Sequence, residues 1–143
     1  MTDSKTMQDI LKSFHNATTN TKPKDIRMGD YTLSVEEYEI APKTYKSYYN
    51  IYNLKESNEE LYSLALFESA MVIIKELSMG VNQKKEKIAR LDSQYDDYLQ
   101  EAAVIKAKAK LVTESFKRDV YSAKHDHAVH KMKSIKQQIK AAI

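Results

Sequence analysis

Apolar residues in the first half of the chain recur mostly at a helical spacing. One such run predicts a short helix over residues 3–15, since an i, i+3, i+4, i+7 spacing puts side chains on one helix face. A run of tyrosines with the same spacing predicts another helix over residues 43–56. The apolar positions of the first run are Met7, Ile10, Leu11 and Phe14, and the tyrosines are Tyr45, Tyr48, Tyr49 and Tyr52.

The most apolar helix is expected over residues 58–79. Its apolar positions cover most of the helix circumference, which is typical of a helix buried on several sides. Gly80 stands where a glycine commonly ends a helix. Ser34 with Glu37 matches a capping box, so a short helix ending before Pro42 is also predicted.

Residues 25–34 are the only plausible strand material. Apolar and polar residues alternate there on both sides of Gly29-Asp30, which has glycine first, as two-residue hairpin turns allow. We therefore allow a short β-hairpin near residues 25–33 within a protein that is otherwise mainly α.

A heptad pattern dominates the chain after Gly80. Its steps of three and four residues are typical of a helix that packs along one seam. The pattern loses phase between residues 117 and 127, so residues 81–143 form either one long helix or a helical hairpin that folds back there. The seam comprises Ile88, Leu91, Tyr95, Tyr98, Ala102, Ile105, Ala109, Val112 and Phe116, and it resumes at His125, Ala128, Met132, Ile135, Ile139 and Ala142.

The predicted organisation is a helical N-terminal part over residues 1–80 and a long amphipathic, coiled-coil-like segment over residues 81–143. As one helix, residues 82–143 would span roughly 93 Å, whereas the helix at 58–79 would span about 33 Å. The N-terminal part could not cover such a seam in a compact fold. We therefore expect the seam residues to contact another copy of the chain or a fixed protein partner, unless the segment folds back on itself.

Composition supports a helical protein and excludes several classes of site. The chain has two glycines, two prolines and no cysteine. It therefore lacks a glycine-rich phosphate loop, a disulfide framework and a thiolate metal site. The longest apolar run is far shorter than the ~20 residues that span a bilayer, and the N-terminus carries no secretory signal. A cytoplasmic location is expected, either host cytoplasm or virion if the protein is viral.

The net charge of +3 results from two opposed halves. Residues 104–143 hold ten basic and three acidic residues, whereas residues 1–103 carry a net charge of −4. The basic end could contact nucleic acid without sequence preference, or the acidic front of a neighbouring copy, or only solvent. The candidate polyanion contacts are Lys117, Arg118, Lys124, Lys131, Lys133, Lys136 and Lys140.

Two further clusters are candidate chemical sites. His125, Asp126, His127 and His130 lie close in sequence, but no Glu-x-x-His or His-Glu-x-x-His pattern accompanies them. The tyrosine run with its lysine could stack on bases, but its spacing fits a packing face equally well. We expect no metal site, no cofactor and no catalytic residue.

These patterns favour a non-enzymatic structural or assembly protein that self-associates or docks on a partner through helical seams. A scaffold-type component of a virus particle or of another multi-copy complex would fit. The alternatives are a protein that contacts nucleic acid through its basic C-terminal helix, and a coiled-coil chaperone or adaptor. No membrane contact and no small-molecule substrate are expected.

Overall fold

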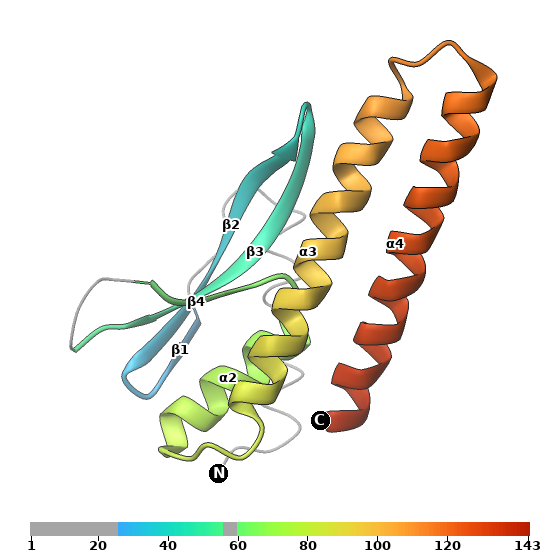
Figure 1. Ribbon diagram of the computed structural model, residues 1–143. Coiled ribbons are helices and arrows are strands. Elements are labelled where there is room, and N and C mark those ends of the chain that lie inside the picture. Colours follow the sequence, from blue (N-terminus) through green and yellow to red (C-terminus); the bar gives the residue numbers. More distant parts are fainter. Residues whose placement is uncertain (1–25, 56–59) are drawn as a thin grey trace.

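Over the residues that the structure describes, the protein is an α+β fold in which a four-stranded antiparallel sheet precedes three helices. A computed structural model describes residues 26–55 and 60–143 (Figure 1). The strands lie in the order β1-β2-β3-β4. The prediction of a mainly α protein is therefore wrong, and the predicted helix at 3–15 lies outside the described residues. The elements are β1 (Ile26–Met28), β2 (Tyr31–Ala41), β3 (Thr44–Asn53), β4 (Glu60–Leu64), α2 (Phe67–Met79), α3 (Lys85–Ala109) and α4 (Ser115–Ala142).

The short hairpin allowed near residues 25–33 is present as β1 and the start of β2. Met28 pairs with Tyr31, so Gly29 and Asp30 form the two-residue turn. Gly29 has a φ of 62°, a backbone conformation that glycine adopts without steric cost. The strand then continues to Ala41, so the capping-box helix predicted after Ser34 is absent.

The tyrosine run forms β3 and not the helix predicted over residues 43–56. Strand neighbours point to opposite faces, so Tyr45 and Tyr49 share one face whereas Tyr48 and Tyr52 share the other. Tyrosine is also favoured in strands, where it packs against cross-strand neighbours. Tyr49 pairs with Val35 of β2 and with Leu64 of β4, so β3 is held on both sides.

The predicted helix at 58–79 divides into a strand and a shorter helix. Residues 60–64 form β4, which pairs with β3, and α2 begins only at Phe67. Its expected end is confirmed, because Gly80 has a φ of 70° and its backbone N–H donates to the helix carbonyls of Glu76 and Leu77.

The heptad-patterned segment is a helical hairpin, so the long coiled-coil-like helix is not present. The chain turns at residues 110–114, a few residues before the predicted phase slip, and α4 returns along α3. Figure 1 shows α4 on the side of α3 that faces away from the sheet, and the turn extends beyond the sheet. Folding back lets α4 cover much of the seam from within the chain.

One hydrophobic cluster joins the sheet to all three helices. One face of the sheet contributes Leu33, Val35, Ile51 and Leu64, which alternate with polar residues along their strands. Leu66, the residue before α2, is a further buried member, and the helices supply the rest: Ala70, Met71, Val72, Ile73, Ile74, Ile88, Leu91, Ile135 and Ile139.

Helices α2 and α3 each supply a carboxylate that caps the N-terminus of the other. Asp92 of α3 accepts hydrogen bonds from the backbone N–H groups of Ala65 at 2.8 Å and Leu66 at 3.0 Å, just before α2. Glu76 of α2 accepts hydrogen bonds from the backbone N–H groups that open α3, those of Gln83, Lys84 and Lys85, at 2.8–3.0 Å. These contacts satisfy donors that would otherwise lack partners at the two helix starts.

Replacing Glu76 with glutamine is expected to lower the free energy of unfolding near neutral pH. The difference in this free energy between the two proteins should shrink in acid. Burial alone would raise the pKa of Glu76, but the N–H groups of Lys84, Lys85 and Gln83 hold it below its ordinary value of 4.5. The ionised carboxylate therefore stabilises the fold above pH 4.5, and this contribution is lost as the pH falls through the lowered pKa. Urea midpoints of both proteins between about pH 7 and about pH 3 measure the difference. An equal difference at every pH would contradict this origin.

Candidate functional site

The far end of the α3–α4 hairpin exposes large apolar side chains. We call residues 104–124 the hairpin tip. Leu111 is 85% exposed and Phe116 is 77% exposed, while Val104 and Val120 at the two flanks are 37% and 38% exposed. A group of exposed apolar side chains on a soluble fold marks a contact site more often than a scattered single residue does.

Basic residues surround these apolar side chains. The hairpin tip holds six basic and two acidic residues, a net charge of +4. One acidic residue, Glu114, lies 3.9 Å from the Lys117 ammonium, and the Arg118 guanidinium donates a hydrogen bond to the Val112 carbonyl. The exposed basic side chains are Lys106, Lys108, Lys110, Lys117, Arg118 and Lys124.

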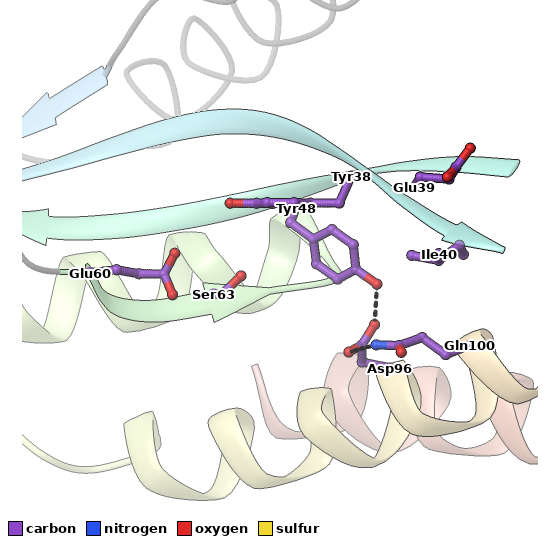
Figure 2. Close-up of a pocket in the computed structure, with 8 residues that line it drawn as sticks. All are labelled: Tyr38, Glu39, Ile40, Tyr48, Glu60, Ser63, Asp96 and Gln100. Carbon is purple, nitrogen blue, oxygen red and sulfur yellow. Dashed lines mark hydrogen bonds between the residues drawn. The ribbon is translucent and has the colours of Figure 1, made fainter. Parts of the chain in front are cut away.

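A second candidate surface is a cleft of about 450 Å³ between the sheet and α3, which we call the tyrosine cleft. Figure 2 shows the ring of Tyr48 pointing from β3 toward α3, with Glu60 and Ser63 on β4 and Ile40 near the end of β2. The residues that line the cleft are Tyr38, Glu39, Ile40, Tyr48, Glu60, Ser63, Asp96 and Gln100.

Hydrogen bonds fix the tyrosine and the carboxylate that join the sheet to α3. The Tyr48 hydroxyl donates to Asp96 Oδ1 at 2.5 Å, and Gln100 Nε2 donates to Asp96 Oδ2 at 2.8 Å (Figure 2). Burial, followed by the hydrogen bond to Asp96, raises the pKa of Tyr48. Tyr48 therefore stays a neutral donor at physiological pH and is not suited to act as a base.

A network around Glu36 orders the sheet face beside the cleft. Its carboxylate accepts hydrogen bonds from Tyr38 at 2.5 Å, from Asn50 at 2.6 Å and from Tyr52 at 3.0 Å. The Tyr38 ring meets the Tyr48 ring edge-on at 5.6 Å and is 42% exposed. The cleft thus offers aromatic surface next to carboxylates, a combination suited to apolar and cationic groups.

A groove of about 370 Å³ between α3 and α4 connects the two surfaces. Gln100 lines both the tyrosine cleft and this groove, which continues past Val104 and Lys108 to Tyr121 and Lys124. One continuous surface therefore runs along α3 from the acidic cleft to the basic hairpin tip.

The predicted seam residues acquire neighbours inside the chain. Ile88, Leu91, Ala102, Ile105, Ile135 and Ile139 are buried, and Tyr95, Tyr98, Ala109, Val112 and Met132 are half-buried. Phe116 is the member that stays largely exposed. Whether these side chains also contact a second molecule stays a prediction.

The predicted polyanion contacts lie mainly along the outer surface of α4. Lys117, Arg118, Lys124, Lys131, Lys133 and Lys140 are exposed, and Lys136 is half-buried. Lys117, Arg118 and Lys124 belong to the hairpin tip. Their contact with nucleic acid or an acidic protein stays a prediction.

The described part of the chain was predicted to hold no metal site and to make no membrane contact, and the structure bears on both points as follows. Within residues 26–55 and 60–143, no group of three or more histidine or acidic side chains is placed to hold a metal ion. His125 and Asp126 are sequence neighbours, with Nδ1 and Oδ1 3.9 Å apart. No described helix combines the length and the apolar character needed to cross a bilayer.

Sequence reasoning missed the tyrosine cleft. Its residues come from three strands and one helix, and Tyr48 and Asp96 are 48 positions apart. The acidic run Glu36-Glu37-Tyr38-Glu39 beside the tyrosines was the available signal. This signal is ambiguous because the local spacing of both segments also fits a helix.

Comparisons with known proteins identify no relative of this chain. No protein-family model, no curated protein and no solved structure matches the chain.

Proposed function

We propose that this protein is a non-enzymatic assembly protein that associates through the tip of its α3–α4 hairpin. The observation that carries the proposal is the exposure of Leu111 and Phe116 at the end of a projecting hairpin. Burying one large apolar side chain contributes about 1.5–3 kcal/mol, so covering both supplies a substantial driving force for association.

The basic residues around the two apolar side chains indicate what kind of protein surface the tip would contact. Lys110 and Lys117 are exposed next to these side chains, so a partner with acidic groups around an apolar recess would fit. The tyrosine hydroxyls of the cleft support a binding role over a catalytic one. The pKa values of Tyr38 and Tyr48 are raised, and both hydroxyls donate to carboxylates.

The double substitution Leu111→Ser with Phe116→Ser tests the proposal. We expect the unaltered protein to sediment faster as its concentration rises, and the double variant to associate at least roughly a hundredfold more weakly. Sedimentation velocity over a wide concentration range gives the comparison. Urea unfolding should give nearly equal midpoints, since both replaced side chains are exposed.

Met79→Ser provides a matched control. Met79 is 60% exposed at the end of α2, away from the hairpin tip, so its loss should leave association unchanged. Equal association by the double variant and the unaltered protein would contradict the proposal. So would an unaltered protein that stays monomeric at every concentration.

A further inference from the structure

We infer that the partner is a second copy of this chain, and that two copies pair antiparallel along α3 with the hairpin tip of each against the tyrosine cleft of the other. This inference rests on the proposed function, and it adds that the hairpin tip binds the tyrosine cleft of a second copy. The opposite charges of the two surfaces, their separation along one helix and the continuity of the surface between them carry it.

The charges of the two surfaces are complementary. The hairpin tip has a net charge of +4, whereas Glu39, Glu60 and Asp96 line the tyrosine cleft. Tyr38 presents a partly exposed ring in the same cleft. An incoming Phe116 could pack against this ring, and neighbouring lysines could meet the carboxylates.

The basic end of the hairpin tip lies well away from the cleft carboxylate Asp96 along α3 of the same copy. Asp96 and Lys110 are 14 residues apart along α3 and its final turn, which corresponds to about 21 Å. This exceeds the Debye length of about 8 Å at physiological salt, so the acidic and basic ends of one copy scarcely neutralise each other. A second copy can supply the missing charge to both ends.

A two-fold axis across α3 exchanges the two surfaces. If the axis crosses the helix midway between Asp96 and Lys110, near Val104, the tip of each copy lies at the cleft of the other. Val104 is exposed and lines the groove that joins tip and cleft. Both contacts then form at once, so the arrangement closes as a dimer and does not continue as a filament.

Charge reversal tests which surface receives the hairpin tip. One variant carries Lys110→Glu and Lys117→Glu, and the other carries Glu39→Lys and Glu60→Lys. The first variant lowers the net charge of the hairpin tip from +4 to 0, and the second replaces two cleft carboxylates with ammonium groups. Each variant alone therefore loses charge complementarity at both contacts of its dimer, so we expect it to associate roughly tenfold or more weakly than the unaltered protein. In the mixture, the introduced glutamates of one variant face the introduced lysines of the other at one contact, and an unaltered tip meets an unaltered cleft at the other contact. The mixture should regain association within about threefold of the unaltered protein. This recovery would also show that both variants fold.

A cysteine placed near the axis tests the antiparallel arrangement. The chain has no cysteine, so Val104→Cys introduces a single thiol. Two such thiols lie together at the axis of the dimer, and mild oxidation should give a disulfide-linked dimer quickly. Gln138→Cys, exposed on α4 and far from the axis, should cross-link much more slowly. Equal rates for the two variants would overturn the antiparallel pairing.

The outcomes separate this inference from the proposed function. If the serine variant of the hairpin tip loses association but both charge-reversed variants keep it, the proposed function stands and the cleft is not the acceptor. If mixing the reversed variants restores nothing, the pairing of these two surfaces is wrong. A monomeric unaltered protein overturns both proposals.

Discussion

Replacing Asp92 with alanine is expected to lower the free energy of unfolding by roughly 3 kcal/mol, since two buried backbone donors lose their acceptor. The Asp92 side chain is 1% exposed, and its two oxygens accept the N–H groups of Ala65 and Leu66. Burial raises the pKa of Asp92, and the N–H groups of Ala65 and Leu66 oppose that rise. The carboxylate is therefore costly to bury, but its removal leaves two N–H groups unpaired in the core.

Urea unfolding measures this effect as a lower midpoint with an unchanged dependence on denaturant. Ser93→Ala is the matched control, because Ser93 is the adjacent residue on α3 and is exposed. The loss of stability in Asp92→Asn should lie between the losses in Asp92→Ala and Ser93→Ala. The amide offers one acceptor oxygen, but it places a donor against the second N–H. A loss below about 0.5 kcal/mol for Asp92→Ala would show that the capping contacts add little to stability.

Replacing Ile139 with alanine is expected to lower the free energy of unfolding by about 3 kcal/mol, although the residue lies near the end of the chain. Ile139 is 0% exposed and belongs to the same cluster as Met71 and Ile73 of α2. Truncating it removes buried apolar surface and leaves a cavity between α4 and the rest of the core.

Ile143→Ala is the control for this substitution. Ile143 lies four residues further on and is 48% exposed, so its truncation should change stability by less than about 0.5 kcal/mol. Urea unfolding of both variants gives the comparison. Equal small effects would mean that the end of α4 does not form part of the cooperative core.

Local sequence signals predicted the features that depend on a few neighbouring residues. Gly29-Asp30 marked the first turn, and Gly80 marked the end of α2. The seam from Ile88 onward indicated helices that pack along a stripe. In each case a single local requirement decides the structure, either a positive φ or a repeat on one helix face.

The sheet was missed because its pattern also fits a helix. Tyr45, Tyr48, Tyr49 and Tyr52 lie on one face of a helix, but on two faces of a strand, and both faces of β3 are used. Tyr49 lies on the core face, and Tyr48 lies on the face that meets Asp96. Pairing with β2 and β4 decided between the two structures, and that pairing involves residues distant in sequence.

The position of the helical turn was predicted only approximately. The phase slip near residues 117–127 indicated a break, and the chain turns at 110–114. No glycine or proline marks this turn, since the four such residues lie at or before Gly80. The tyrosine cleft could not be predicted from local patterns, because four separate elements supply its lining.

The exchange of carboxylates between α2 and α3 makes the two helices one unit of unfolding. If α2 unravels, the amides at the start of α3 lose Glu76, and if α3 unravels, the amides before α2 lose Asp92. Neither helix can open by itself without exposing unsatisfied donors in the other. Backbone amides at both helix starts should therefore exchange with solvent through a single shared opening event, with one common free energy of opening.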